Sequence, residues 1–228
     1  MFGKNLKLKP DHKNGEVLKV HSIFGTFQGE GPYTGYPSIF IRLSGCNLAC
    51  SFCDTEFESY KEMSVEEIII QGYKKFEEFS QKLNDYKPLI VITGGEPMRQ
   101  NITPLCINLL TRGHAVQIES NGTIISPQLP QQVKIVCSPK PCNEKYYRIR
   151  PDILKQAIAV KFLISQTYME YMNIYEVGQT DYNIPVYVQP MDEYDQQKNS
   201  NNLKLAMKVA SQNGAILSLQ THKIIGIE

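Results

Sequence analysis

SIFIRLSGCNLACSFC, the stretch from Ser38 to Cys53, joins a short β-branched run to a loop that carries three cysteines. The run Ser38–Leu43 has the length and composition of a buried strand. Cys46, Cys50 and Cys53 therefore lie together on one loop at the carboxyl end of a predicted strand. Three thiols in such a place form a candidate metal site.

Similar apolar, β-branched runs recur along the chain. Each is five or six residues long and is bounded by turn-forming residues, as expected of buried strands. Together they predict seven strands: Ser38–Leu43, Leu89–Thr93, Ala115–Glu119, Val133–Cys137, Ala159–Ile164, Pro185–Gln189 and Ala215–Leu219.

Helical periodicity occupies several of the intervals between these strands. Ser64 and Glu67 form a capping-box pattern before apolar residues at helical spacing. Cap residues and periodicity predict three helices: Ser64–Leu83, a helix with Thr103 as N-cap followed by Pro104 and ended by Gly113, and Asn201–Asn213 closed by Gly214. The polar segment Asp192–Asn202 is expected to be a loop.

Alternating strands and helices favour parallel strands joined by right-handed crossovers. We therefore expect an α/β fold, an open partial (β/α) barrel in a single domain over residues 1–228, with residues 1–15 as a flexible N-terminal extension. A doubly wound sheet is the alternative. In both architectures the ligand site lies at the carboxyl ends of the strands.

Composition excludes several classes of protein. The 228 residues are 42% apolar and 21% charged, with a formal net charge of +1. This balance argues against a disordered chain and against a general nucleic-acid-binding surface. The apolar runs are too short to span a membrane, and the lysine-rich start is unlike a signal peptide, so we expect a cytoplasmic protein without a membrane partner.

The cysteine spacing is consistent with more than one kind of site. Three thiolates can hold a cubane iron–sulfur cluster and leave one iron open to a further ligand. A structural zinc site, which normally has four protein ligands, and three buried cysteines without metal are the alternatives. Cys106, Cys137 and Cys142 have no paired metal-ligand spacing, and Cys106 is expected in the core.

A second motif, Thr93-Gly-Gly-Glu-Pro97, follows the predicted strand Leu89–Thr93. By itself it could be an ordinary turn. It follows the CxxxCxxC motif in the sequence, and that motif has Phe52 before its third cysteine. In this context the segment resembles the GGEP motif of the radical AdoMet superfamily. The resemblance implies a [4Fe–4S] cluster on Cys46, Cys50 and Cys53, and S-adenosyl-L-methionine cleaved to a 5′-deoxyadenosyl radical.

Within that superfamily the sequence resembles the 7-carboxy-7-deazaguanine synthases from about Ile23 to its last residue. Many members of that family have extra residues between the first two cysteines, whereas this chain has the short spacing. The resemblance rests on six ordered segments: 27–32 (FQGEGP), 53–55 (CDT), 119–122 (ESNG), 137–140 (CSPK), 188–192 (VQPMD) and 219–223 (LQTHK).

This family resemblance implies an activity and its partners. The expected reaction is the AdoMet- and Mg²⁺-dependent ring contraction of 6-carboxy-5,6,7,8-tetrahydropterin to 7-carboxy-7-deazaguanine, with loss of ammonia, in deazapurine (queuosine-type) biosynthesis. The implied partners are this pterin, a one-electron reductase or flavodoxin-like donor, and a second copy of the chain in a homodimer. No direct contact with nucleic acid is implied.

The resemblance also implies site residues. Thr55 would contribute an oxygen ligand to Mg²⁺, and the carboxylate of the last residue, Glu228, would reach the substrate. The remaining substrate residues would be Phe27, Gln28, Gly29, Glu30, Arg42, Thr93 and His222, and the AdoMet site would be lined by Phe52, Gly95, Glu96, Ser138, Pro139, Lys140, Gln189, Pro190, Met191 and Asp192.

Two of these assignments have support from the residues themselves. Alternation along Ser38–Leu43 places Arg42 on the face opposite Ile41, so we expect its guanidinium inside the barrel. An inward guanidinium needs an anionic partner, either a substrate carboxylate or an internal pair with Glu30 or Glu119. At the other end of the chain, the apolar residues of 224–227 suggest that the tail packs back on the barrel mouth.

Two other functions remain open from the sequence. A glycyl-radical-activating enzyme shares the CxxxCxxC motif but does not explain the segments 28–31 and 220–222. A non-enzymatic, zinc-stabilised binding module, possibly for RNA, would rest on the three cysteines and the lysines of the first 13 residues.

Overall fold

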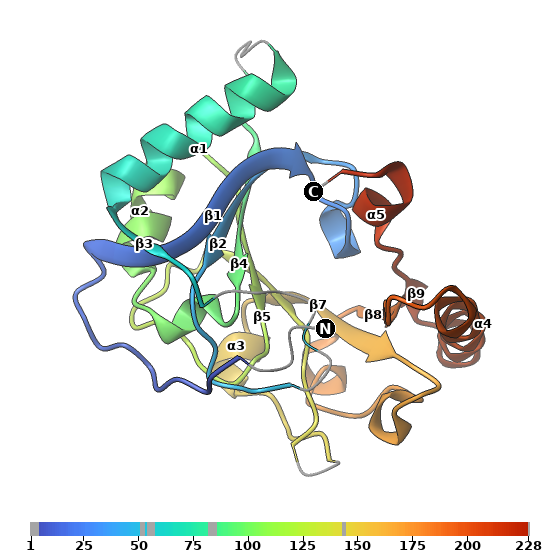
Figure 1. The fold of residues 1–228 in the computed structure, drawn as a ribbon. Helices are drawn as coiled ribbons and strands as arrows, with labels where there is room; N and C mark the ends of the chain where they lie inside the picture. The colour runs from blue at the N-terminus through green and yellow to red at the C-terminus, as the bar shows by residue number, and fades with distance from the viewer. Residues whose placement is uncertain (1–4, 51–52, 54–57, 82–85, 143–144, 228) are drawn as a thin grey trace.

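A computed structural model of the chain describes residues 5–50, 53, 58–81, 86–142 and 145–227. Their strands form one sheet in the order β3-β1-β2-β4-β5-β6-β7-β8-β9. The sheet curves around a central space, and its edge strands β3 and β9 do not meet (Figure 1). The expected open α/β barrel in a single domain is confirmed.

Seven strands of this sheet are parallel, and they are the seven that the sequence predicts. Runs buried on both faces are typical of parallel strands, which explains why they stand out in the sequence. In sheet order they are β2 (Pro37–Leu43), β4 (Leu89–Gly94), β5 (Val116–Ser120), β6 (Lys134–Cys137), β7 (Ala157–Ile164), β8 (Val186–Pro190) and β9 (Ile216–Leu217).

Two antiparallel strands were not predicted. β1 (Val17–Phe27) pairs with β2, and β3 (Lys61–Ser64) pairs with the start of β1. β1 carries polar residues such as Lys19 and His21 among its apolar ones, with a register shift near this point. A regular apolar pattern is therefore absent from the longest strand of the sheet.

Helices cover parts of the convex face. α1 (Val65–Ser80) packs on β1 and β2, and the predicted capping box is present: Ser64 Oγ accepts from the Glu67 N–H, and the Glu67 carboxylate accepts from the Ser64 N–H at 2.7 Å. α4 (Gln196–Asn213) packs on β8, while α3 (Pro151–Leu154) and α5 (Thr221–Ile225) are short. No helix in the described part of the chain is long and apolar enough to cross a membrane.

Two helix starts differ from the prediction. α2 (Thr103–Thr111) has Ile102 as its N-cap, because the Thr103 hydroxyl bonds the Pro127 carbonyl instead of the helix. α4 begins at Gln196, so the C-terminal part of the predicted loop Asp192–Asn202 is helical. Asp195 caps this helix by accepting from the Lys198 N–H, a signal that the polar composition of the first turn obscured.

The N-terminal residues from Asn5 onward lie along the domain. The Asp11 N–H donates to the Arg99 carbonyl at 2.7 Å, and Asn101 Nδ2 donates to the Asn14 carbonyl at 3.0 Å. Gly15 is buried, and a Cβ there would stand 2.2 Å from the Asn101 carbonyl oxygen. The flexibility expected of residues 1–15 stays a prediction.

Candidate active site

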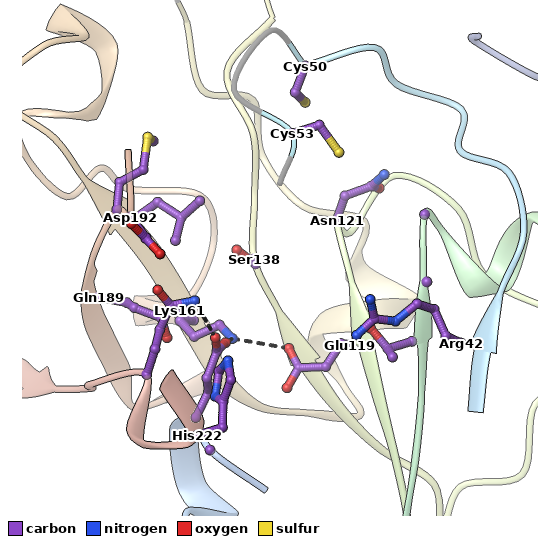
Figure 2. Close-up of a pocket in the computed structure, with 18 of the residues that line it drawn as sticks. Arg42, Cys50, Cys53, Glu119, Asn121, Ser138, Lys161, Gln189, Asp192 and His222 are labelled. Atoms are coloured by element: carbon purple, nitrogen blue, oxygen red, sulfur yellow. Dashed lines mark hydrogen bonds and ion pairs between the residues drawn. The ribbon is translucent and has the colours of Figure 1, made fainter. Parts of the chain in front are cut away.

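The candidate active site is a cavity of about 390 Å³ on the concave side of the sheet, at the carboxyl ends of its strands. Cysteine thiols lie at one end, and Arg42, Glu119 and His222 lie toward the other (Figure 2). The cavity brings together most of the residues expected from the sequence: Cys46, Cys50, Cys53, Phe27, Gln28, Gly29, Glu30, Arg42, Thr93, Gly95, Ser138, Lys140, Gln189, Pro190, Met191, Asp192 and His222.

The three motif cysteines line this cavity together, and all six cysteines of the chain are free thiols. Burial raises the pKa of Cys46 to about 11, and burial also raises that of Cys50 while the nearby Lys140 charge lowers it. Thiolates buried in this cavity therefore require nearby positive charge, which a bound metal would supply. Among the described residues no three Cys, His, Asp or Glu side chains are grouped closely enough for one metal ion. A cubane binds each thiolate on a different iron, so three cysteines around one cavity fit a cluster.

The segment at Gly94 and Gly95 connects the carboxyl end of β4 to that of β2 through backbone hydrogen bonds. The Gly95 N–H donates to the Leu43 carbonyl at 3.3 Å, and the Glu96 N–H donates to the Gly45 carbonyl at 3.0 Å. A Cβ on Gly95 would stand 2.4 Å from the Gly45 carbonyl oxygen, so a larger residue would push the cysteine loop away. These glycines position the loop as well as lining the cavity.

Glu96 is fully buried beneath that loop and does not line the cavity. Its carboxylate accepts hydrogen bonds from the N–H of Met98, the N–H of Asn121 and the hydroxyl of Ser120, at 2.7–3.2 Å. Burial raises the pKa of Glu96 to about 7, although these hydrogen bonds oppose the rise. Glu96 thus joins the end of β4 to the end of β5.

A buried lysine pairs with two carboxylates at the end of the cavity that holds Arg42 and His222. Lys161 Nζ contacts the carboxylate of Glu30 and lies 3.3 Å from that of Glu119 (Figure 2). Burial alone would raise the pKa of Glu30, but the Lys161 charge brings it down to about 2. Burial raises the pKa of Glu119 and outweighs the opposing effect of Lys161. Glu30 is therefore the carboxylate that Lys161 holds ionised.

Arg42 reaches the cavity from β2, as the strand alternation predicts. Its guanidinium stands 5.4 Å from the centre of the Phe24 ring, in the cation–π range, and its register partner on β4 is Thr93. Among the described residues, no carboxylate forms an ion pair with Arg42, and Glu30 and Glu119 both pair with Lys161 instead. The arginine is therefore available to an anionic ligand.

α5 places His222 against Gly29. The Thr221 N–H donates to the Gly29 carbonyl at 3.0 Å, and a Cβ on Gly29 would stand 2.1 Å from His222 Nδ1. Gln220 Nε2 donates to the Glu30 carboxylate at 2.9 Å. The expected apolar packing of the tail is wrong, because Ile224 and Ile225 are 68% and 60% exposed and polar contacts hold α5.

Other polar side chains line the cavity between its two ends. Lys140 Nζ donates to the carbonyl and to the hydroxyl of Ser138, both at 2.7 Å, and burial lowers the pKa of Lys140. Asp192 accepts from Lys223 Nζ at 2.7 Å. These residues surround the middle of the cavity with donors and one carboxylate.

The agreement with the sequence analysis has limits. Pro139 is buried behind the cavity, as Glu96 is, and Phe52, Thr55 and Glu228 lie outside the described residues. Lys161 was missed, although a lysine inside the apolar run AIAVKFLI is a recognisable signal for a buried charge. Further lining residues that were not assigned are Asn5, Phe24, Phe40, Leu48, Gly94, Glu119, Ser120, Asn121, Leu163, Tyr194, Gln220 and Lys223.

Comparisons with known proteins find relatives along the whole chain. The 7-carboxy-7-deazaguanine synthase of Rickettsia prowazekii is 53% identical over 230 residues, which cover 100% of this chain and 96% of the relative. The 7-carboxy-7-deazaguanine synthase of Rhodospirillum rubrum is 35% identical over 251 residues, which cover both chains fully, at 100% of each.

Among solved structures, the crystal structure of QueE from Escherichia coli matches with a TM-score of 0.67 and 22% identity. The match covers 89% of this chain and 93% of that one, and it shows a shared fold. No family model matches the chain.

Proposed function

The chain belongs to the 7-carboxy-7-deazaguanine synthase family and is a radical AdoMet lyase, and on this premise we propose that its substrate is 6-carboxy-5,6,7,8-tetrahydropterin. The proposed reaction is the Mg²⁺-dependent contraction of the pterin ring to 7-carboxy-7-deazaguanine with release of ammonia. The observation that carries the proposal is one cavity with cluster-type cysteines at one end and, at the other, carboxylates beside Arg42, which forms no ion pair within the described part of the chain.

The cysteine end suits the cofactors of this reaction. Cys46, Cys50 and Cys53 would hold a [4Fe–4S] cluster, and Ser138 and Lys140 line the same cavity as these cysteines. When bound, the cluster and AdoMet supply the 5′-deoxyadenosyl radical that abstracts a substrate hydrogen. The protein's own part is to position both ligands and to exclude water.

The middle of the cavity would bind AdoMet. Gly95 presents its backbone, and the segment 189–192 at the end of β8 presents Gln189, Met191 and Asp192. Lys140 donates to Ser138 and so fixes that hydroxyl on the wall. Two residues assigned to the AdoMet site are not among these lining residues. Phe52 lies outside the described residues, and Glu96 would act indirectly, because it is buried behind the cysteine loop.

The other end has the charges that a carboxylated pterin requires. The planar guanidinium of Arg42 can bind a carboxylate through two hydrogen bonds, and His222 stands at the same end. Glu30, held ionised by Lys161, can accept hydrogen bonds from the N–H groups of a pterin ring. Gln28 and Thr93 add neutral polar groups, while Phe27 and Gly29 complete the wall.

Other parts of the proposal come from the family alone. Thr55 would contribute an oxygen to Mg²⁺, and the terminal carboxylate of Glu228 would reach the substrate; both residues lie outside the described part of the chain. A one-electron reductase or flavodoxin-like protein would reduce the cluster. Free thiols at all six cysteines suit the reducing cytoplasm as the place of action.

We also propose that the chain forms a homodimer. The edge strand β9 exposes Ile216 and Leu217, and Met207 of the neighbouring α4 is 53% exposed. Apolar side chains beside an unpaired strand edge are suited to a second copy of the chain. Sedimentation equilibrium under anaerobic conditions should show a mass of twice 26.0 kDa.

Anaerobic turnover tests the proposed function. The reconstituted protein should convert 6-carboxy-5,6,7,8-tetrahydropterin to 7-carboxy-7-deazaguanine when AdoMet, a reductant and Mg²⁺ are present, with ammonia as the second product. Chelation of Mg²⁺ should slow the reaction. Formation of 5′-deoxyadenosine without conversion of this pterin would refute the substrate and leave the radical AdoMet assignment in place.

A further inference from the structure

The N-terminal segment Asn5–Gly15 lies directly on the cysteine loop. Lys7 forms a parallel bridge with Cys46, and the Leu8 N–H donates to the Cys46 carbonyl at 2.7 Å. Asn5 is only 9% exposed, and its Nδ2 atom donates to Cys53 Sγ at 3.5 Å. Asn5 also lines the cavity with the cysteines. The segment therefore contacts two of the three candidate cluster ligands.

Arg99 forms hydrogen bonds both with this segment and with the start of the cysteine loop. It is 6% exposed; Nη1 donates to the Lys9 carbonyl at 3.0 Å, and Nη2 donates to the Ser44 carbonyl at 3.3 Å. A Cβ on Gly45 would stand 2.8 Å from the Arg99 guanidinium. The arginine is thus packed against the residue that precedes the first cluster cysteine.

The Arg99 guanidinium keeps an unpaired donor in this place. Its buried Nε has no hydrogen-bond partner in the described structure. This buried cation is packed against Gly45, the residue before Cys46, and a positive charge in such a place favours additional negative charge on a cluster bound there.

We propose that the segment Asn5–Gly15 is part of the cluster site: the Asn5 amide donates to the Cys53 sulfur, and Arg99 is the positioning residue whose charge faces the Cys46 side. Together they raise the reduction potential of the cluster. Hydrogen bonds to ligand sulfurs and nearby positive charge both stabilise the more negative, reduced state of a cluster. The inference rests on the proposed function, because it needs the cluster to be present.

Point variants test the proposed effect on the reduction potential better than removal of the segment does. Truncation would change both the hydrogen bonds to the cluster ligands and the access of water to the cluster. Asn5→Leu removes the amide donor at similar size, and Arg99→Met removes the charge but keeps an apolar side chain. The matched control is Lys9→Gln, because Arg99 binds the Lys9 carbonyl while the lysine side chain is exposed. A screened surface charge should have little effect on a cluster.

The measurement is an anaerobic redox titration of each reconstituted protein, followed by electron paramagnetic resonance without substrate or AdoMet. Asn5→Leu and Arg99→Met should each have a midpoint potential more negative than that of the parent, and Lys9→Gln should match the parent. If Arg99→Met does not retain a cluster, Arg99→Lys takes its place. The midpoint potential of Arg99→Lys should be closer to that of the parent than the midpoint potential of Asn5→Leu is.

Two other outcomes are separable. Equal midpoint potentials for the parent and Asn5→Leu at equal cluster content would overturn the inference and leave the proposed function standing. A parent protein that binds no [4Fe–4S] cluster after reconstitution would refute the proposed function itself.

Discussion

The ammonium of Lys161 lies 3.3 Å from the carboxylate of Glu119, inside a cavity where the lysine side chain is only 5% exposed. The same ammonium pairs with Glu30, which follows β1 in the sequence. Lys161 is therefore the positive charge that stabilises two buried carboxyl groups within one cavity. Without it, burial would raise the pKa of both Glu30 and Glu119.

Lys161→Met should destabilise the protein and impair the substrate end of the site. Loss of one partner from a buried ion pair typically costs about 3–5 kcal/mol, because the remaining charge has no compensation. Both carboxylates should then protonate more readily, and an uncharged Glu30 accepts fewer hydrogen bonds from a ligand. Anaerobic urea unfolding and kcat/KM for the pterin measure the two effects.

The matched control is Lys155→Met, since Lys155 is exposed at the end of α3. Its free energy of unfolding should stay within about 0.5 kcal/mol of the parent. An unfolding free energy for Lys161→Met equal to that of the control would show that the lysine is not a required counter-charge.

A strand could be predicted from the sequence where its own residues form an apolar run. The seven parallel strands appear as apolar runs, and most of them are buried in the sheet, whereas β1 mixes polar and apolar residues and was missed. The site was predictable where motif residues are adjacent in sequence. Lys161 and Glu30 are 131 positions apart, and no local pattern relates them. Asn5 was overlooked for the same reason, because its partner Cys53 is 48 positions away.

The pH dependence of stability should show two separate windows. Glu30 has its pKa lowered to about 2 from an ordinary value of 4.5, so its contribution is present above pH 4.5 and is lost as the pH falls toward 2. Burial raises the pKa of Glu96 to about 7. Between pH 4.5 and 7 the folded state keeps a proton that the unfolded state has lost, so stability falls as the pH rises.

Glu96→Gln should therefore remove the part of the decline between pH 4.5 and 7 that Glu96 causes, which is on the order of 3 kcal/mol, and leave the smaller part that the raised pKa of Glu119 causes. The loss of stability below pH 4.5 should remain, because Glu30 is unchanged. The variant should also be less stable at every pH, since an amide cannot accept all the hydrogen bonds from Ser120 and Asn121. Urea unfolding at closely spaced pH values is the measurement, and an unchanged slope between pH 4.5 and 7 would contradict the assignment.

Replacement of Cys46, Cys50 or Cys53 by Ala should abolish cleavage of AdoMet, because all three thiolates are needed to hold a cubane with one open iron. Cys142→Ala is the control, since this thiol is exposed and does not line the cavity. Formation of 5′-deoxyadenosine by anaerobic protein is the readout. Undiminished cleavage by Cys50→Ala would remove that residue from the ligand set.

Arg42→Lys should strongly impair turnover of the pterin while cluster content and AdoMet binding are retained. Lysine preserves the charge but not the two-pronged geometry that suits a carboxylate. We expect a loss of about 2–5 kcal/mol, or roughly thirtyfold and upward in kcat/KM. Arg112→Lys is a matched change at an arginine outside the cavity, paired with Glu66 on the surface. Equal kcat/KM for the two variants would mean that Arg42 does not bind the substrate.

Gly29 and His222 should be coupled, because only a residue without a Cβ leaves room for the imidazole. A Cβ at position 29 would stand 2.1 Å from Nδ1 and 2.9 Å from Cβ of His222, so the start of α5 must move as well as the ring. Gly29→Ala should therefore lower kcat/KM for the pterin about as much as His222→Ala does. In the His222→Ala background the added methyl group meets no imidazole and only the Cβ of residue 222 stays close, at 2.9 Å, so the second substitution should cause a smaller further loss. A double-mutant cycle of kcat/KM values should thus give a coupling energy of about 1–3 kcal/mol, within the range for residues in contact. Strictly additive effects of the two substitutions would contradict this coupling. Gly29 would then be required only for the local backbone conformation, and the position of His222 would not depend on Gly29.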